Sequence, residues 1–122
     1  MDSQSEIQRF EDLVVWKKAM NLSALVYRIT QGNGLSKDWG LRDQLGRAAV
    51  SIPSNIAEGF GRFSSKDFRY FLAIANGSAN ELRSQIHLAE KLGYVDPTTA
   101  GCLLDKCIEV SRMIKGLRNK VK

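Results

Sequence analysis

The sequence predicts an all-α protein, an antiparallel up-down-up-down four-helix bundle, and three observations support this class. Apolar residues recur at spacings of three and four through four long segments, which is the period of one helix face. Only a few turn-forming residues separate these segments, so that consecutive helices are expected to be antiparallel neighbours. No strand-like alternation of apolar and polar residues competes with this pattern. With 122 residues, 43% of them hydrophobic, the chain can bury the core of one domain.

The first helix is expected over about residues 12–31 of a single domain that spans residues 10–122, after a flexible tail of residues 1–9. Asp12 is its candidate N-cap, because a carboxylate there accepts a hydrogen bond from the first turn. Two apolar groups cover most of this helix, although a surface helix of a bundle needs only one. Either the helix is deeply buried, or its second face packs against another subunit. The groups are Leu13, Trp16, Met20, Ala24 and Tyr27, and Val14, Leu22, Leu25, Val26 and Ile29.

Residues 40–62 are the most informative stretch, and they predict a second helix that begins between Ser36 and Leu41, after a break at residues 32–34. One apolar stripe would face the core, and a file of polar residues runs beside it at spacings of three or four. Gly59 and Gly61 are expected to close the helix. The stripe is Leu41, Leu45, Ala48, Ala49, Ile52 and Ile56, and the polar file is Gln44, Arg47, Ser51, Asn55 and Glu58.

Pro53 lies within this second helix, where it removes the hydrogen bond to the carbonyl oxygen of Ala49 at a cost of about 3 kcal/mol. The neighbouring Ser51, Ser54 and Asn55 carry short polar side chains that can bind the backbone groups that a proline frees. One interpretation is therefore a structural kink with local hydrogen-bond repair. The alternative is that the kink exposes Asn55, Glu58 and Arg47 to a binding partner.

The third helix is expected over about residues 65–92, and residues 64–67 at its start resemble a capping box. Gly77 inside it predicts a close approach of another helix, because glycine there costs about 1 kcal/mol relative to alanine. Asp96 followed by Pro97 predicts the start of the fourth helix. The two apolar stripes are Phe68, Phe71, Leu72, Ala75, Ala79, Leu82, Ile86 and Ala89, and Ala100, Leu103, Leu104, Cys107, Val110, Ile114, Leu117 and Val121.

Polar residues of the second and third helices are expected to form an interhelical network. Glu58 and Glu81 would form a carboxylate pair if the helices crossed near them, but bundle carboxylate sites usually add Glu-x-x-His pairs, which this sequence lacks. The preferred interpretation pairs Glu58 or Glu81 with Arg47. The predicted network consists of Gln44, Arg47, Ser51, Asn55, Glu58, Ser78, Glu81 and Gln85.

The sequence does not favour an enzyme, and we expect no catalytic residue, metal or cofactor. His87 is the only histidine, and it lies away from the apolar stripe of the third helix. Cys102 and Cys107 are five residues apart on a helix and point in different directions, so we expect two reduced, buried thiols without a disulfide or a metal cluster. The chain has neither a run of 18 apolar residues nor a secretory signal, which predicts a cytoplasmic protein without a membrane partner.

The net charge of +5 comes entirely from the end of the chain. Residues 1–111 hold thirteen Lys or Arg and thirteen Asp or Glu, whereas residues 112–122 hold five cations and no acid. These cations either complement the negative end of a helix dipole or form a phosphate-binding surface that an oligomer would repeat. The candidate nucleic-acid-binding residues are Arg112, Lys115, Arg118, Lys120 and Lys122, together with Arg62, Lys66 and Arg69.

An ordered set of motifs closely resembles that of the four-helix-bundle proteins encoded in intervening sequences of bacterial large-subunit rRNA, which are often labelled ribosomal protein-like. The likeness covers about residues 10–120. In one departure, residues 34–36 stand where the family usually has a Phe-Pro pair. The motifs are Phe10-Glu11-Asp12-Leu13-x-x-Trp16-x-x-Ala19, Gln44-Leu45-x-Arg47-Ala48-Ala49-x-Ser51-Ile52-Pro53-x-Asn55-Ile56-Ala57-Glu58-Gly59, Phe68-x-x-Phe71-Leu72-x-Ile74-Ala75-x-Gly77-Ser78-x-x-Glu81-Leu82 and Leu92-Gly93-Tyr94.

The resemblance implies an association with rRNA and a ring-shaped homo-oligomer, commonly a pentamer. It also implies a similarity to the accessory proteins of diversity-generating retroelements, which are basic oligomers that bind nucleic acid and a reverse transcriptase. Two hypotheses follow, namely a non-enzymatic oligomer that binds RNA through a basic surface, and an oligomeric scaffold that binds a protein. Because the sequence has no aromatic-rich strand surface, we do not expect sequence-specific recognition of a single strand.

Overall fold

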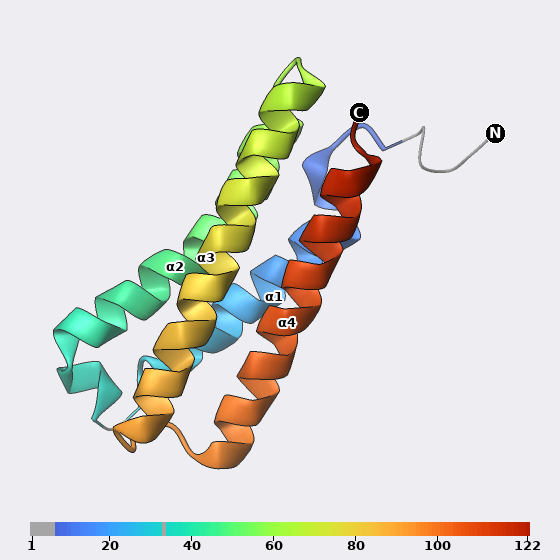
Figure 1. The fold of residues 1–122 in the computed structure, drawn as a ribbon. Helices are drawn as coiled ribbons and strands as arrows, with labels where there is room; N and C mark the ends of the chain where they lie inside the picture. The colour runs from blue at the N-terminus through green and yellow to red at the C-terminus, as the bar shows by residue number, and fades with distance from the viewer. Residues whose placement is uncertain (1–6, 33) are drawn as a thin grey trace.

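The computed structural model describes residues 7–32 and 34–122, and its framework is four long helices (Figure 1). They are α1 (Val14–Ile29), α2 (Trp39–Phe60), α3 (Ser65–Lys91) and α4 (Pro97–Lys120), with short 3-10 helices at Phe10–Asp12 and Leu35–Lys37. The described residues contain no strand, which confirms the predicted all-α class. Residues 1–6 of the predicted tail lie outside the described residues, and Ile7 packs against the core.

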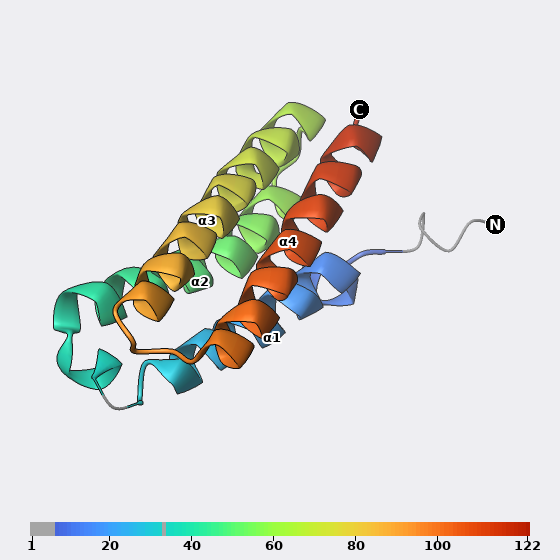
Figure 2. The same ribbon diagram turned by 60° about the horizontal axis from the view of Figure 1, so that its bottom comes forward.

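Consecutive helices run in alternating directions and pack side by side, as Figures 1 and 2 both show. α2 lies against α1 and α3, and α4 lies against α3 and α1, which closes the bundle. The turn between α2 and α3 and the end of α4 consequently lie at the same end of the molecule (Figure 1). This topology brings the two basic regions of the sequence, near residues 62–69 and 112–122, to one end. None of the described helices combines the length and apolar character that crossing a membrane requires.

Each helix contributes one buried face to the core. In α1 this face is Val15, Ala19, Leu22 and Val26, at the spacing of one helical stripe, so Leu22 and Val26 of the second predicted group pack inside. The predicted stripes of the other three helices are confirmed. Their buried residues are Leu45, Ala48, Ala49, Ile52 and Ile56 in α2, Leu72, Ala75, Ala79, Leu82, Ile86 and Ala89 in α3, and Ala100, Leu103, Cys107, Val110 and Ile114 in α4.

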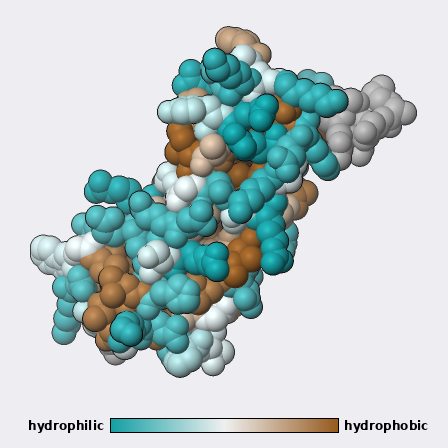
Figure 3. Space-filling model, in the orientation of Figure 1, coloured by the Kyte–Doolittle hydropathy of each residue, from teal (hydrophilic) through white to brown (hydrophobic). Residues whose placement is uncertain are grey.

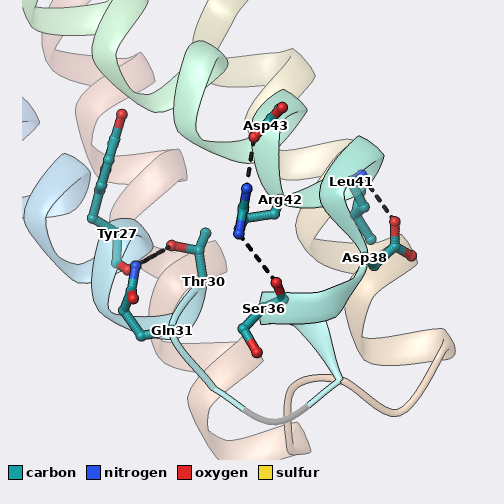
Figure 4. Close-up of polar contacts among 8 residues, drawn as sticks. All are labelled: Tyr27, Thr30, Gln31, Ser36, Asp38, Leu41, Arg42 and Asp43. Carbon is teal, nitrogen blue, oxygen red and sulfur yellow. Dashed lines mark hydrogen bonds and ion pairs between the residues drawn. The ribbon is translucent and has the colours of Figure 1, made fainter.

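The connection between α1 and α2 is held by short-range polar contacts, which Figure 4 draws. The Asp38 carboxylate caps α2 by accepting a hydrogen bond from the Leu41 N–H at 3.1 Å. The Arg42 guanidinium donates to the main-chain oxygen of Ser36 at 3.1 Å. Leu35 is fully buried in the core, so the departure from the family's Phe-Pro pattern still leaves an apolar anchor in this connection.

Tyr94 ties the α3–α4 connection to the start of α2. Its hydroxyl donates to the second carboxylate oxygen of Asp38 at 2.9 Å, and this hydrogen bond raises the pKa of the phenol above its ordinary value. The Tyr94 ring lies against Gly34, where an added Cβ would be 2.8 Å from the ring's Cδ1 atom. Gly34 also has a φ of +81°, so both the close contact and the backbone conformation require glycine there.

The helix caps agree with the sequence at two of three predicted positions. Ser64 and Asp96 cap α3 and α4, each accepting a hydrogen bond from the main-chain N–H three residues on, at 3.0 Å and 2.8 Å. The prediction for Asp12 is wrong, because α1 begins at Val14 and its N-cap, Leu13, has no capping side chain. Asp12 instead belongs to a 3-10 helix that directly precedes α1.

Two glycines have roles that differ from their predictions. Gly59 lies inside α2 rather than past its end, and an added Cβ would be 2.7 Å from the Cβ of Phe71 and 3.0 Å from the Phe68 ring. This position is therefore where α2 and α3 approach closely. Gly77 is exposed, with no neighbouring atom within 4 Å of an added Cβ, so the predicted close approach at Gly77 is wrong within the described chain.

α2 continues through Pro53 without interruption. The carbonyl oxygen of Ala49, which the proline deprives of its usual donor, accepts a hydrogen bond from the Ser23 hydroxyl of α1. The sequence had suggested that Ser51, Ser54 or Asn55 would bind this carbonyl. The hydrogen bond comes instead from a neighbouring helix.

Candidate nucleic-acid interface

Four basic side chains from two distant segments line one hollow at the end of the bundle. Lys66 and Arg69 come from the start of α3, and Arg118 and Lys122 come from the end of the chain. Arg118 is anchored there, because its Nε donates to the main-chain oxygen of Arg69 at 3.3 Å. Ser65, Tyr70 and Ala73 complete the lining. The hollow thus joins two basic regions that the sequence presented separately.

Helix geometry explains why these side chains meet. The Ser64 cap fixes the first turn of α3, and spacings of three and four then place Lys66, Arg69 and Tyr70 on one face. On α4 the same spacings align Lys115 with Arg118 and with Lys122 just beyond the helix end. This file continues to Ser111, whose hydroxyl donates to Asn76 of α3, so it faces α3. Lys115 therefore continues the line of Arg118 and Lys122 along α4, outside the lining of the hollow.

The charge around the hollow is mainly positive. Within residues 7–32 and 34–122, the ion pairs of the structure do not involve Lys66, Arg69, Arg118 or Lys122. The amino end of α3 adds the positive end of a helix dipole, whereas the end of α4 contributes a negative one that its cations also complement. The face that carries α3 and α4 is largely hydrophilic, with apolar patches between the polar side chains (Figure 3).

The other predicted basic residues do not line this hollow. Arg62 forms an ion pair with Glu58 at 2.9 Å and lies over the Phe71 ring, 4.8 Å from its centroid. Lys120 lies two residues from Arg118, about 200° around the helix. It lines an apolar hollow with Ile7 and other core-edge residues. Arg112 is exposed elsewhere on α4. The C-terminal tract is therefore divided between helix faces instead of forming one surface.

Tyr70 is a lining residue that the sequence analysis missed. Its ring packs at 81° to that of Phe71 with centroids 5.3 Å apart, yet the residue is 62% exposed. The signal was present in the sequence, because a tyrosine outside the apolar stripe lies four residues after Lys66 and directly after Arg69.

Five of the eight residues predicted for the interhelical network are joined by hydrogen bonds. The hydroxyls of Ser51 and Ser78 are 2.8 Å apart and link α2 to α3. The Asn55 amide donates to the main-chain oxygen of Ser51 at 2.8 Å and to its hydroxyl at 2.9 Å. Gln85 donates to Gln44 at 3.5 Å, near the limit of a hydrogen bond. The Ser51–Ser78 and Gln85–Gln44 contacts bridge the closely packed pair of α2 and α3, whereas the Asn55 hydrogen bonds lie within α2.

The predicted pairing of Arg47 with Glu58 or Glu81 is wrong for the part of the chain that the structure describes. Glu58 pairs with Arg62 one turn later on the same helix, and Glu81 is exposed. Arg47 lines a separate hollow between α1 and α2, together with Tyr27. The reason is the position of Arg47 on the helix. It lies about 80° around α2 from Asn55, and the Arg47 side chain therefore lies toward α1 instead of α3.

An apolar groove lies on the outer side of α1 and α2. Trp16, Met20, Ala24 and Tyr27, all from the first apolar group predicted for α1, line it with residues of α2. Met20 and Tyr27 are 44% and 50% exposed. The contribution of α2 is Val50, Pro53, Ser54 and Ala57. The face of α1 formed by this first group is therefore only partly covered by the described helices of this chain.

The two cysteines differ in their surroundings. Cys107 is buried in the core, and this burial raises the pKa of its thiol to about 12. Cys102 is exposed, contrary to the expectation that both thiols are buried, because it lies on the outer side of α4. Both are free thiols. Among the described residues, no group of three or more His, Cys, Asp or Glu side chains is placed to hold a metal ion.

Comparison with known proteins gives a family and a fold. A model of the 23S rRNA-intervening sequence protein family matches residues 11–116. No curated protein matches the chain. Among solved structures, the fold is similar to a protein with unknown function from the S23 ribosomal protein family of Bacteroides thetaiotaomicron VPI-5482, determined by crystallography at 1.70 Å resolution. The two sequences are 21% identical, with a TM-score of 0.77 over 86% of this chain and 98% of that one.

Proposed function

The chain belongs to the 23S rRNA-intervening sequence protein family, and from this premise we propose that it is a non-enzymatic homo-oligomer that binds RNA. The observation that carries the proposal is the convergence of Lys66, Arg69, Arg118 and Lys122 on one hollow. Contacts to phosphates fix position without reading bases, so binding through these cations is expected to be largely independent of sequence. Each subunit of an oligomer would repeat the hollow, and weak contacts would then add by avidity.

The apolar groove supports self-association. Trp16, Met20 and Tyr27 line this groove, in which Met20 and Tyr27 are exposed, and a second copy of the chain is the occupant we propose for it. The resemblance of the sequence to ring-forming proteins favours a closed ring, commonly a pentamer, in which the groove of one subunit receives part of the next.

RNA binding is tested by paired charge removal. The variants Lys66→Gln/Arg69→Gln and Arg118→Gln/Lys122→Gln each take two cations from one wall of the hollow. Both should weaken binding and flatten the dependence of log Kd on log salt, because each lost phosphate contact removes about 0.7–0.9 from that slope. Fluorescence anisotropy with a labelled RNA at several salt concentrations measures both quantities.

The matched control is Lys37→Gln/Lys91→Gln, which removes the same charge from exposed positions outside the hollow. This control should bind RNA nearly as the unchanged protein does. Equal slopes for the unchanged protein and both wall variants would contradict the proposal. They would favour the explanation in which the C-terminal cations only complement the dipole of α4.

Self-association is tested on the groove. Met20→Lys places a charge in the apolar surface without disturbing the core, whereas Asn21→Lys adds the same charge at an exposed position beside it. Light scattering at micromolar concentration should show an oligomer for the unchanged protein and for Asn21→Lys, and a smaller species for Met20→Lys. A monomer of 13.6 kDa for the unchanged protein would contradict the proposal.

The same groove also favours a second candidate, an oligomeric scaffold or accessory subunit for a protein such as a reverse transcriptase. In that case a protein partner, and not RNA, would remain bound after nuclease treatment. Binding of that partner would then be lost in Met20→Lys and retained in the two wall variants of the basic hollow.

A further inference from the structure

One exposed aromatic side chain lines the basic hollow, and a second is close in the chain to one of the lining residues. Tyr70 lines the hollow itself and is 62% exposed. Phe63 lies in the turn between α2 and α3, two residues before Ser65 of the hollow lining, and its side chain is fully exposed. Elsewhere on this end of the bundle, aromatic side chains pack together, as Phe60 does with Phe68 at 5.9 Å between ring centroids. Phe63 and Tyr70 are thus set apart by their exposure.

The cations alone do not distinguish one form of RNA from another, since both duplexes and single strands present phosphates. Aromatic rings do make this distinction, because they stack on the faces of unpaired bases, which a duplex covers with its own base pairs. Stacking tolerates any base, so it adds no sequence specificity. This is compatible with the expectation from the sequence that a single strand is not recognised sequence-specifically.

We infer that the basic hollow binds unpaired RNA, with phosphates on its cations and bases stacked on Tyr70 and Phe63. The inference rests on the proposed function and narrows its ligand from RNA in general to single strands. Arg69 and Tyr70 are adjacent in the chain, and Lys66 lies one helical turn before Tyr70, so a phosphate and a neighbouring base can be held on the same face of α3.

Tyr70 has a support that favours such a role. Its ring packs edge-to-face with Phe71, whose ring is in turn covered by the Arg62 guanidinium at 4.8 Å from the centroid. Arg62 is itself held by Glu58 at 2.9 Å. The Tyr70 ring is therefore packed against a neighbouring ring, which restrains it and lowers the entropy lost when a base stacks on it.

The test compares a uridine 12-mer with an RNA duplex of the same length. Tyr70→Leu and Phe63→Leu keep apolar side chains at exposed positions, so that folding is preserved. Each should weaken binding of the single strand by about fivefold to a hundredfold, leave binding of the duplex unchanged, and leave the salt slope unchanged. Trp39→Leu, at an exposed aromatic that lies away from the hollow, is the matched control and should have no effect.

A second measurement needs no variant. A strand that contains 5-bromouridine should form photo-crosslinks to Tyr70 or Phe63, mapped by mass spectrometry. Equal affinity of the unchanged protein for both RNAs, or single-strand binding that Tyr70→Leu and Phe63→Leu leave intact, would overturn the inference while RNA binding itself stands. An unchanged protein that binds neither RNA would overturn the proposed function as well. Loss of binding to phosphatidylserine vesicles in Phe63→Leu, with RNA binding unaffected, would overturn the inference in favour of a lipid surface.

Discussion

The Ser23 hydroxyl donates a hydrogen bond across the α1–α2 interface to the main-chain carbonyl oxygen of Ala49, at 2.7 Å. Ala49 lies four residues before Pro53, so its carbonyl has no donor within α2. The hydroxyl also lies 3.0 Å from the oxygen of Ala19, but it has a single proton, and the shorter distance favours Ala49. Both Ser23 and Ala49 are buried, and a buried carbonyl without a partner would destabilise the fold. Ser23 thus compensates for the proline of a neighbouring helix.

This relationship predicts a coupled pair of substitutions. Ser23→Ala should lower the free energy of unfolding by about 1–3 kcal/mol, because it leaves the Ala49 carbonyl unpaired. In a Pro53→Ala background the restored N–H of residue 53 can bind that carbonyl, so Ser23→Ala should cost less there. Urea denaturation of the four proteins measures the coupling. An equal cost in both backgrounds would mean that Ser23 stabilises the fold through other contacts.

The two helical glycines that differ from their predictions should respond in opposite directions to alanine. Gly59→Ala should destabilise the fold by about 1–3 kcal/mol, since the new methyl group would overlap the Cβ of Phe71. Gly77→Ala should stabilise it by about 0.5–1 kcal/mol, since alanine favours a helix and the space is open. Thermal unfolding distinguishes the two. A destabilising Gly77→Ala would indicate that another subunit packs closely on that face of α3.

Asn55 is expected to act in structure. Its amide is half-buried and donates twice to Ser51, which in turn reaches Ser78 on α3. Asn55→Ala should therefore lower the free energy of unfolding by about 1 kcal/mol. Ser84→Ala, at an exposed position of α3 outside this network, is the control and should have little effect. An unchanged melting temperature together with weakened RNA binding would favour the interpretation in which Asn55 contacts a partner.

The two thiols should react at very different rates in the folded protein. Cys102 is exposed and should be modified quickly by a chromogenic disulfide reagent, which reaches it directly from solvent. Cys107 should react only on unfolding, because burial removes it from the reagent and raises the pKa of its thiol to about 12. Cys102→Ser should leave no rapidly reacting thiol. Two rapid equivalents in the unchanged protein would contradict the buried position of Cys107.

The parts of the fold that the sequence predicted correctly are those that depend on local patterns. The stripes of α2, α3 and α4 follow from helical periodicity, and the caps at Ser64 and Asp96 depend on hydrogen bonds within the first turn of their own helices. Asp12 does not cap α1 because it is the last residue of a 3-10 helix, and the Phe10 ring of that helix packs on Trp16 with 5.2 Å between ring centroids. A propensity for capping does not include such a contact.

The parts that the sequence did not determine depend on which faces of two helices meet. A helical wheel places Arg47 and Asn55 in one polar file. It does not show that Arg47, at one edge of that file, lies toward α1. The hydrogen bond from Ser23 to the Ala49 carbonyl oxygen, which compensates for Pro53, likewise joins residues that are 26 positions apart. All four cations of the basic hollow were among the residues predicted from charge and helical spacing. That they lie together depends on the register between α3 and α4, which the sequence does not show.

Acid should weaken the fold partly through Asp96. Its carboxylate accepts hydrogen bonds from the N–H and the hydroxyl of Thr99, at 2.8 Å and 3.0 Å, and chiefly the N–H contact lowers the pKa of the carboxyl below its ordinary value of 3.8. Because the folded state favours the ionised form, this contribution to stability is present above pH 3.8 and is lost as the pH falls through the lowered pKa.

Asp96→Asn keeps an oxygen that accepts from the Thr99 N–H but cannot ionise, so it separates the charge from the cap. The melting temperature of the unchanged protein should exceed that of Asp96→Asn near neutral pH, and the difference should shrink below about pH 3.8 as Asp96 becomes protonated. Thermal unfolding from neutral to acidic pH measures this convergence. Asp105→Asn removes the same charge from an exposed position on α4 that caps nothing, and its curve should show no such convergence. A constant difference between Asp96→Asn and the unchanged protein at every pH would mean that the charge of Asp96 adds nothing to the cap.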